Sequence, residues 1–286
     1  MSGFSPARLV RYAMAHPIGE RQRLRTLARI ARWQLSARLL GGPRVHPWVG
    51  GSRLVVERGM TGATGNVYFG LHEFADMGFV LHMLRADDLF VDIGANIGSF
   101  TILAAKVAGA RVIAFEPDTN TVATLARNID ANGVGGQVEV HTSALGDREQ
   151  ELWFTSGMDT INHVADADTP GAVRVHGTTL DTVLAGRVPL LIKIDVEGHE
   201  PAVIAGAPKT LASPQLQAVE VETVTQDIAD LLAGHGFVQR HYDPFTRRLS
   251  STPVHAANNS LYVRDEALVA QRLQSAPPVD VYGIAV

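Results

Sequence analysis

The sequence contains no cysteine, and only three of its 25 basic residues are lysine. A chain without cysteine has no disulfide framework, no thiolate metal site and no cysteine nucleophile. No apolar run approaches the roughly 18–20 residues that a membrane-spanning helix needs. The first residues lack the apolar block of a signal peptide, so we expect a soluble, cytoplasmic protein. A net charge of −4 argues against a general nucleic-acid binder.

The positive charge is concentrated near the N-terminus. Residues 1–44 hold nine arginines and one acidic residue, Glu20, whereas the rest of the chain carries a net charge of −12. Arg25, Arg29 and Arg32 lie beside an apolar stripe at helical spacing. Three interpretations stay open: the stripe packs on the main domain, the helix contacts an anionic membrane surface or a polyanionic substrate, or it binds a partner protein. The stripe consists of Leu24, Leu27, Ala28, Ala31, Leu35 and Leu39.

After this basic N-terminal helical extension (1–44), the chain divides into three parts. Residues 45–88 contain β-prone pieces at 53–57 and 66–69 between glycines, which predict a small hairpin, and then a helix over 73–84. Residues 89–264 alternate apolar strands with helices, which predicts an α/β core with a mostly parallel sheet. Residues 265–286 are a C-terminal tail.

Within 89–264 the order of elements is regular. Helices are expected over 97–109, 118–131 and 226–233 and from residue 200. The last two strands should pair as a hairpin and place one antiparallel strand in the sheet. The predicted strands cover 89–93, 111–115, 138–141, 189–194, 217–221, 237–241 and 260–263. Ligands in such sheets bind beyond the carboxyl ends of the strands, so the residues that follow each strand are the informative ones.

A glycine-rich loop follows the first of these strands. Gly94 and Gly98 allow a tight turn, and Asn96 stands where a dinucleotide fingerprint needs its second glycine. The N-terminus of the next helix supplies free N–H groups. Asp92 precedes the loop, where its carboxylate would repel a pyrophosphate but help to hold a cationic amino-acid group.

Two further strand ends extend this predicted cofactor site. Glu116 follows the second strand, where an acidic side chain accepts hydrogen bonds from ribose hydroxyls. Ser143 and Asp147 follow the third strand, where an adenine would lie. Together with Asp92 and the glycines, these residues predict an adenosine ligand without a diphosphate, a description that S-adenosylmethionine fits.

The densest polar cluster follows the fourth strand. Residues 193–200 read KIDVEGHE and contain Asp195, Glu197, His199 and Glu200. Three carboxylates and an imidazole at a strand end indicate a functional site. Glu222, at the end of the fifth strand, can face the same cleft, although Glu200 is also placed to cap the next helix and Lys193 to pair with a carboxylate.

These motifs resemble the FkbM-type family of S-adenosylmethionine-dependent methyltransferases. The stretches that carry the resemblance are FVDIGANIGSF (90–100), AFEP (114–117), TTLDTVL (178–184) and IKIDVEGHE (192–200). The resemblance covers about residues 53–264. It implies a Rossmann-like, doubly wound α/β fold of the class I methyltransferase type, with seven strands of which the seventh is antiparallel. It also implies methyl transfer, usually to a hydroxyl oxygen of a sugar, polysaccharide or secondary metabolite.

Methyl transfer to a hydroxyl is helped by a base near the acceptor. Asp195 is the first candidate, because it ends the strand expected nearest the methyl group, and His199 and Glu200 follow. A divalent metal bridging Asp195, Glu222 and the acceptor oxygens is an open alternative, although no ligand spacing predicts a metal site.

Acceptor-binding residues are expected on two segments. Residues 155–178 are polar and break the strand–helix rhythm, which predicts a lid or acceptor-binding loop with Thr160, Asn162 and His163 near the substrate. His72 and Glu73 are expected to reach the cleft from the N-terminal side, an expectation that rests on the resemblance. Glu197 and Glu222 complete the expected acceptor site.

Two other functions compete with methyl transfer. One is a non-catalytic module that binds the cofactor or docks to a glycan-assembly system. The other is a nicotinamide-dependent oxidoreductase, against which the glycine spacing and Asp92 both count. The sequence leaves the oligomeric state and the acceptor open, and the basic helix over residues 8–40 leaves open a peripheral contact with a membrane.

Overall fold

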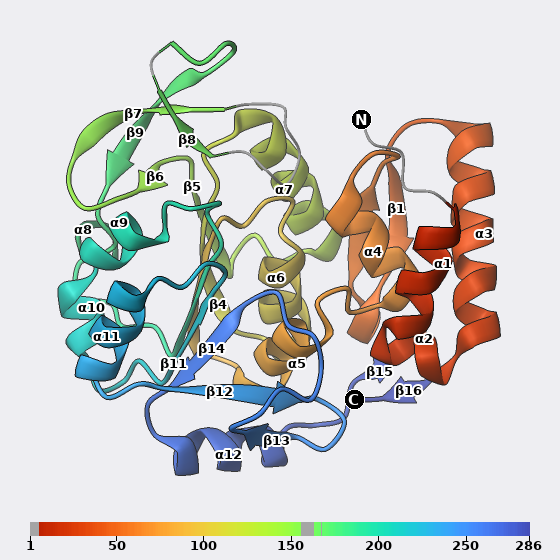
Figure 1. Cartoon of the computed structure of the whole chain (residues 1–286). Helices are drawn as coiled ribbons and strands as arrows, with labels where there is room; N and C mark the ends of the chain where they lie inside the picture. The colour runs from red at the N-terminus through yellow and green to blue at the C-terminus, as the bar shows by residue number, and fades with distance from the viewer. Residues whose placement is uncertain (1–5, 156–162, 167) are drawn as a thin grey trace.

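The computed structural model describes residues 6–155, 163–166 and 168–286. At its centre is an eight-stranded sheet in the order β13-β12-β14-β11-β10-β3-β4-β5 (Figure 1). Strand β14 runs antiparallel to both of its neighbours, and the strands from β11 to β5 run parallel to one another. The strands are β3 (Leu89–Ile93), β4 (Arg111–Phe115), β5 (Val138–His141), β10 (Leu191–Ile194), β11 (Ala218–Val221), β12 (Val238–Asp243), β13 (Arg248–Ser250) and β14 (Ser260–Val263).

This sheet confirms the predicted fold class. All seven predicted strands are present, and the last two pair antiparallel, which puts β14 between β11 and β12. The structure adds β13 at the edge, joined to β12 by a turn over residues 244–247. The fold is therefore a Rossmann-like α/β fold of the class I methyltransferase type with one extra edge strand.

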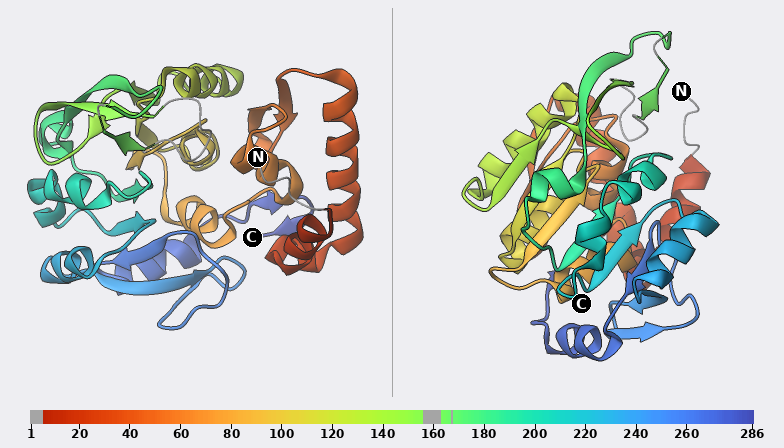
Figure 2. Two further views of the ribbon diagram at one scale, coloured as in Figure 1. Left: turned by 45° about the horizontal axis from the view of Figure 1, so that its top comes forward. Right: turned by 90° about the vertical axis from the view of Figure 1, so that its left-hand side faces the viewer.

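Helices cover both faces of the sheet (Figure 2), and each face has its own apolar core. Alternate residues of each strand enter opposite cores, so Phe90 and Leu191 enter one and Val91 and Ile192 the other. The first core is closed by α5 (Phe74–Met83), α6 (Ser99–Ile102), the π-helical η2 (Leu103–Ala108), α7 (Thr119–Asn132) and α12 (Glu266–Ser275). The second is closed by α8 (Leu180–Leu184), α9 (Glu200–Ala205), α10 (Pro208–Ala212) and α11 (Gln226–Gly234).

The predicted helices after β3 and β4 differ in regularity. The helix predicted over 97–109 begins at Ser99 and changes to a π-helix at Leu103. The helix expected from residue 118 is regular, and the Asp118 carboxylate accepts hydrogen bonds from the backbone N–H groups of Asn120 and Thr121. Asp118 is therefore the N-cap of α7.

The N-terminal part is mostly helical, and the predicted hairpin is wrong in one of its strands. Strand β2 (Arg53–Val56) pairs with β1 (Arg44–Pro47) around η1 (Val49–Gly51), and residues 66–69 belong instead to α4 (Thr61–Phe69). A β-carbon on Gly65 would lie 2.3 Å from Nδ1 of His72, so α4 needs glycine there to approach the following turn. Close packing of α4 therefore overrides the β propensity of its last residues.

Helices α1 (Pro6–Ala15), α2 (Pro17–Arg21) and α3 (Arg23–Leu40) precede the hairpin. The inward face of α3 carries Thr26, Ile30, Trp33 and Ala37, all buried. All but one residue of the stripe that was a candidate for packing lie on the opposite face, where Leu24, Ala28, Ala31, Leu35 and Leu39 are exposed; Leu27, at its edge, is half-buried. Packing of that stripe on the main domain is therefore excluded. No helix in the described part of the chain is long and apolar enough to cross a membrane.

Residues 155–178 are not the continuous loop that the sequence predicted. Strands β8 (Val164–Ala165) and β9 (Val173–Thr178) join β6 (Ala144–Leu145) and β7 (Gln150–Phe154) in a second sheet of order β6-β9-β7-β8. Polar residues on the exposed side of this second sheet interrupt the apolar runs by which its strands would be recognised in the sequence. The chain ends in a hairpin of β15 (Asp280–Val281) and β16 (Ile284–Ala285), where the Tyr282 hydroxyl donates to the carbonyl oxygen of Val67 on α4.

Candidate active site

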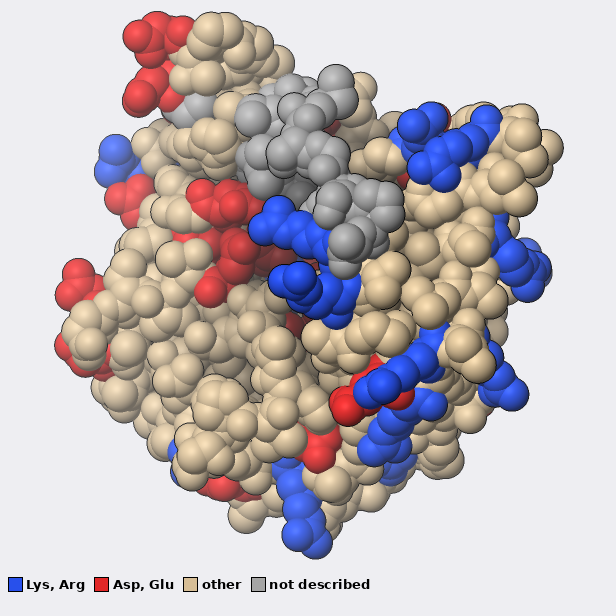
Figure 3. Space-filling model, turned by 45° about the vertical axis from the view of Figure 1, so that its right-hand side comes forward, with Lys and Arg blue, Asp and Glu red and all other residues tan. Residues whose placement is uncertain are grey.

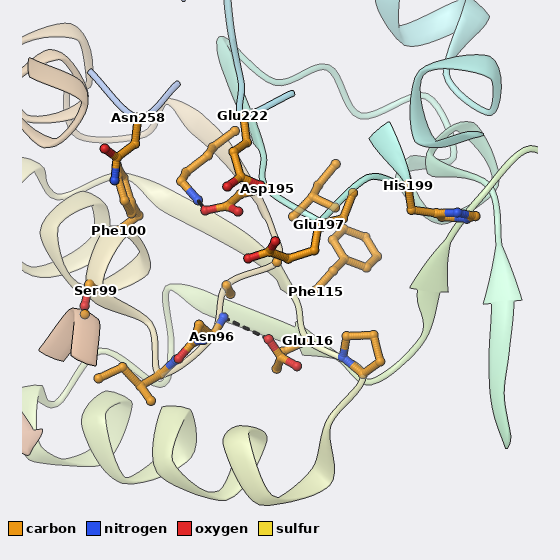
Figure 4. Close-up of a pocket in the computed structure, with 18 of the residues that line it drawn as sticks. Asn96, Ser99, Phe100, Phe115, Glu116, Asp195, Glu197, His199, Glu222 and Asn258 are labelled. Atoms are coloured by element: carbon orange, nitrogen blue, oxygen red, sulfur yellow. Dashed lines mark hydrogen bonds and ion pairs between the residues drawn. The ribbon is translucent and has the colours of Figure 1, made fainter. Parts of the chain in front are cut away.

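A cavity of about 270 Å³ lies at the carboxyl ends of the parallel strands (Figure 4). Its walls come from the ends of β3, β4, β10 and β11, from α4 and the turn after it, and from Asn258 before β14. This is the edge of the sheet at which the sequence predicted a ligand. Of the predicted residues, the lining includes His72, Glu73, Gly94, Asn96, Glu116, Ser143, Asp195, Glu197, His199 and Glu222.

The glycine loop after β3 is fixed by its neighbouring strands. The backbone N–H groups of Gly94 and Ala95 both donate to the carbonyl oxygen of Phe115 at the end of β4. Gly94 has φ +78°, and a β-carbon there would lie 1.8 Å from the carbonyl oxygen of Asp195. The glycine is thus required by the close approach of β3 to the turn after β10. Gly98 has φ +89°, packs against Leu125 and lies outside the cavity lining.

Glu116 holds the other side of the same loop. Its Oε2 accepts a hydrogen bond of 2.9 Å from the backbone N–H of Asn96, and its Oε1 accepts one of 2.9 Å from that of Asp118 (Figure 4). Burial raises the pKa of Glu116 to about 7. Each carboxylate oxygen keeps one lone pair, so Glu116 has capacity to accept from a ligand hydroxyl in the cavity.

Beneath the cavity, one face of the sheet carries a row of ionisable side chains. Lys193 on β10 pairs in register with Asp92 on β3 and with Glu220 on β11. All three are buried, and burial raises the pKa of Asp92 and of Glu220. Asp92 accepts a hydrogen bond of 2.6 Å from the Thr101 hydroxyl and does not line the cavity. The structure therefore places Asp92 below the predicted amino-acid site, not in it.

Lys193 reaches from this row to the cavity. Its Nζ donates a 2.7 Å hydrogen bond to Oδ2 of Asp195, and it lies 4.6 Å from the centre of the Phe100 ring. Burial disfavours its charge, but the carboxylates of Asp195, Asp92 and Glu73 outweigh burial and hold the pKa of Lys193 above its usual value. Burial works against the charge of Asp195 as well, and Lys193 outweighs it, so the pKa of Asp195 is lowered. Asp195 is thereby held ionised at the cavity wall.

Three acidic side chains converge beside this ion pair. One ligand oxygen from each of Asp195, Glu197 and Glu222 lies within 4.8 Å of the other two (Figure 4). Burial, followed by the charge of Asp195, raises the pKa of Glu222 to about 8 and raises that of Glu197. Asp195 and Glu222 therefore titrate as a pair with one proton between them at neutral pH. A divalent cation could be held by the three oxygens, but exposed acidic groups such as Glu197 commonly converge without one.

The other two predicted bases lie elsewhere in this region. Glu200 is fully buried, outside the lining, and its Oε1 accepts from the backbone N–H groups of Val196 and Gly198, so it holds the turn after β10 together. His199 lines the cavity, but its ring points away from Asp195 (Figure 4), and burial lowers its pKa.

The two residues predicted from the N-terminal side do reach the cavity. Burial lowers the pKa of His72 and raises that of Glu73 to about 8. His72 is neutral at pH 7 as a result, and Glu73 holds its proton through most of the neutral range.

Some of the predicted ligand contacts lie outside the cavity. Asp147 pairs with Arg148 at 3.0 Å and does not line it. His163 is also absent from the lining, although its neighbours Phe154 and Val164 belong to it. Thr160 and Asn162 lie outside the described residues.

Among the lining residues that sequence reasoning did not assign to the site are Asn66, Ser99, Phe100 and Asn258. The buried Asn66 amide joins two walls, because its Nδ2 donates to the Ser99 hydroxyl and its Oδ1 accepts from the backbone N–H of His72. Asn66 was not assigned to the site because residues 66–69 were predicted to form a strand. Its signal is visible only once α4 is recognised as a helix that faces the glycine loop.

The chain matches the methyltransferase FkbM domain over residues 92–238, which is just over half of its length. It belongs to the FkbM methyltransferase family. The matched range contains the glycine loop, Glu116 and the 193–200 turn, so the motifs on which the sequence resemblance rested are confirmed.

Two curated relatives illustrate what this FkbM-family chain is similar to. It is 28% identical over 159 residues to the hexuronic acid methyltransferase AglP of Haloferax volcanii, covering 54% of this chain and 65% of that one. It is 28% identical over 226 residues to the 31-O-demethyl-FK506 methyltransferase FkbM of Streptomyces tacrolimicus, covering 64% and 85%. The chain thus spans just under two thirds of the length of AglP.

Among solved structures, the C-terminal domain of precorrin-6Y C5,15-methyltransferase from Rhodobacter capsulatus is similar over 65% of this chain and 84% of that one. Its sequence identity is 17% and its TM-score 0.35. The fold assignment rests on the strand order of the chain itself.

Proposed function

We propose that this protein transfers a methyl group from S-adenosylmethionine to a hydroxyl oxygen of a small-molecule or glycan acceptor. The observation that carries the proposal is the meeting, in one cavity, of the Glu116-bound glycine loop and the ionised Asp195 beside protonated Glu222. Membership in the FkbM methyltransferase family supports it, as do the methyltransferase names of its relatives.

The cavity fits S-adenosylmethionine in its chemistry. Glu116 has free lone pairs for ribose hydroxyls, and Ser143 stands after β5, where an adenine would lie. Asp195 and Glu73 supply carboxyl groups near the expected position of a cationic tail. The cofactor supplies a methyl group on a positively charged sulfur, and the protein has to align an acceptor with it.

Asp195 and Glu222 are the pair that we assign to the acceptor hydroxyl. Lys193 keeps Asp195 charged, and Glu222 loses its proton near pH 8. Above that pH the pair carries two negative charges and would accept the proton of the acceptor hydroxyl, while the oxygen bonds to the methyl carbon and the bond from that carbon to the cofactor sulfur breaks.

The lining charge indicates which acceptors fit. Its described residues include five carboxyl groups, from Glu73, Glu116, Asp195, Glu197 and Glu222, and one ammonium group, from Lys193. Glu73 and Glu222 hold their protons at neutral pH and Lys193 offsets Asp195, so the negative charge that remains is on Glu197 and, in part, on Glu116. An anionic sugar would add a carboxylate beside them, and like charges at close range repel. We therefore propose a neutral or cationic acceptor, in contrast to the substrate class that AglP carries in its name.

Calorimetric titration with S-adenosylhomocysteine tests the cofactor assignment. The parent should bind, and Glu116→Ala should bind at least tenfold more weakly, because a hydrogen bond to a charged group contributes about 1.5–3 kcal/mol. Glu151→Ala, at an exposed position of β7, is the matched control. Glu116→Gln preserves the side-chain shape and is measured in parallel, with thermal melting to verify folding. Absence of binding by the folded parent would favour the docking module instead.

Turnover with paired acceptors tests the charge assignment. Methylated product is measured by mass spectrometry for hexose and hexuronic acid glycosides of equal size. We expect the hexose to react at least tenfold faster. Equal rates would contradict the charge argument and leave methyl transfer intact.

A further inference from the structure

Helix α3 has two apolar faces, and the body of the protein covers one of them. Thr26, Ile30, Trp33 and Ala37 are buried against the neighbouring elements. On the opposite side Leu24, Leu35 and Leu39 are 83%, 60% and 72% exposed, and the exposed Ala28 and Ala31 complete their stripe. Residues 24, 28, 31, 35 and 39 follow the 3.6-residue period, so they form one continuous line on the outer side. Isolated exposed leucines are ordinary, but a stripe of this length is not.

Arginine side chains flank the stripe on both sides. Helix α3 contains five arginines and no acidic residue. By helical position, Arg25 and Arg32 lie along one edge of the stripe, and Arg38 lies along the other. All three are exposed, and none forms an ion pair with another described residue. This part of the surface is therefore apolar at its centre and positive at its borders.

The helix is also placed where a flat surface can reach it. It runs along one outer edge of the molecule in both Figure 1 and the left view of Figure 2. Figure 3 brings this side forward and shows Lys and Arg on its right-hand part, whereas Asp and Glu lie mostly to the left. Its 18 residues span about 27 Å.

The chemistry of this face fits an anionic membrane surface. A helix with leucines on its outer face and arginines beside them lies in the plane of the interface, with the leucines among the acyl chains and the guanidinium groups at lipid phosphates. A second copy of the chain fits less well, because a symmetric contact would bring arginine against arginine with no acidic residue on α3 to pair with them.

We propose that the outer face of α3, defined by Leu24, Ala28, Ala31, Leu35 and Leu39 with Arg25, Arg32 and Arg38, binds the surface of membranes rich in anionic lipid. Binding is peripheral and leaves the helix packed on the protein through Ile30 and Trp33. It brings the whole chain to the membrane surface, independently of what the cavity binds.

The test is co-sedimentation of the full chain with vesicles. Phosphatidylcholine vesicles containing 30% phosphatidylglycerol are compared with pure phosphatidylcholine. The parent should sediment with the anionic vesicles, and 0.5 M NaCl should reduce the bound fraction. Leu35→Gln/Leu39→Gln should lower the partition coefficient about tenfold or more through lost apolar contact. Arg25→Gln/Arg32→Gln should lower it by a similar factor, since each basic residue near an anionic surface adds about fivefold.

Matched controls lie on other exposed surfaces. Leu231→Gln/Leu268→Gln removes two partly exposed leucines from α11 and α12, and Arg127→Gln/Arg248→Gln removes two arginines from α7 and β13. Both controls should sediment like the parent.

The proposal fails if the parent stays in the supernatant, or if the α3 variants sediment as the parent does. Sedimentation velocity of the parent without vesicles tests whether a second copy of the chain covers this face instead. If the parent forms a dimer that Leu35→Gln/Leu39→Gln abolishes, and does not bind vesicles, the face belongs to a dimer interface. Binding of S-adenosylhomocysteine is unaffected in every case, so failure here is separate from failure of the proposed function.

Discussion

Replacing Lys193 with methionine removes the cation that the cavity's acidic groups share. Lys193 is 2% exposed, and its Nζ lies 2.7 Å from Oδ2 of Asp195. At an effective dielectric constant of about 20, two unit charges at this distance attract by about 6 kcal/mol, before the cost of removing both from water is counted. Loss of one partner of a buried pair typically costs about 3–5 kcal/mol. Because 28% of the Asp195 side chain is exposed and can be hydrated, we expect the lower value, about 3 kcal/mol.

The pH dependence of this loss separates charge from packing. Without Lys193, burial raises the pKa of Asp195 in the folded variant, and the hydrogen bond with Glu222 opposes only part of that rise. A carboxyl group whose folded pKa is raised stabilises the fold while it is protonated, and that contribution is lost as the pH rises through the folded pKa. The loss of stability in Lys193→Met should therefore be smaller at pH 5 than at pH 8, by about 1.4 kcal/mol for each unit by which the folded pKa of Asp195 exceeds 5.

Urea unfolding at pH 5 and pH 8 measures both the loss in the free energy of unfolding and its dependence on pH. Lys106→Met, at an exposed position of η2, is the control and should change the free energy of unfolding by less than 0.5 kcal/mol at either pH. An equal loss at both pH values for Lys193→Met would show that the side chain contributes packing alone, and the assignment of an ionised Asp195 would then be wrong.

Two further predictions concern the loop and the acidic pair. Gly94→Ala should destabilise the fold by more than 2 kcal/mol in urea unfolding, since its β-carbon meets a backbone oxygen, whereas Gly133→Ala, with φ +65° and open space, should cost about 1 kcal/mol; equal costs would contradict the close approach of β3 to residue 195. The methylation rate kcat should rise with pH and level off above an apparent pKa near 8, the value for Glu222. In Asp195→Asn that limb should move to lower pH, because the charge that raises the pKa of Glu222 is gone; an unmoved limb would remove Glu222 from the proton transfer.

Sequence reasoning succeeded where local pattern decides the structure. Strands β3, β4 and β14 have the predicted ends, because short apolar runs bounded by glycine or polar residues leave little freedom in length. Glu116 and Asp195 follow strands whose carboxyl ends meet at one edge, so their presence in the cavity follows from a parallel sheet.

The alternation of side chains along a strand explains why Asp92 does not line the cavity, although the sequence predicted it there. Asp92 lies inside β3, two residues after Phe90, and shares its face of the sheet with Lys193 and Glu220. Its carboxylate therefore turns below the cavity. Period-two reasoning applied to β3 alone would have indicated this orientation.

Contacts between distant segments could not be predicted in the same way. No local sequence pattern shows that α4 is a helix that forms a cavity wall. Its packing depends on the close contact of Gly65 with His72 and on the hydrogen bond that the Tyr282 hydroxyl donates to α4. The inward face of α3 was ambiguous for a related reason: both faces are apolar, and the elements packed against α3, which include α4 and His46 of β1, decide that Ile30 and Trp33 are buried.

The N-terminal helices contribute to the cavity through a buried histidine. His16 stacks on Phe69 with ring centres 4.1 Å apart, and its Nε2 donates to the carbonyl oxygen of Leu71 at 3.0 Å. Its Nδ1 accepts from the backbone N–H of Ile18, so the ring is neutral, and burial lowers its pKa to about 4. The residues directly before His72 and Glu73 are thus held by the N-terminal segment. Deleting that segment would disturb the cavity wall together with the outer face of α3, and only point substitutions on that face separate membrane binding from the chemistry of the cavity.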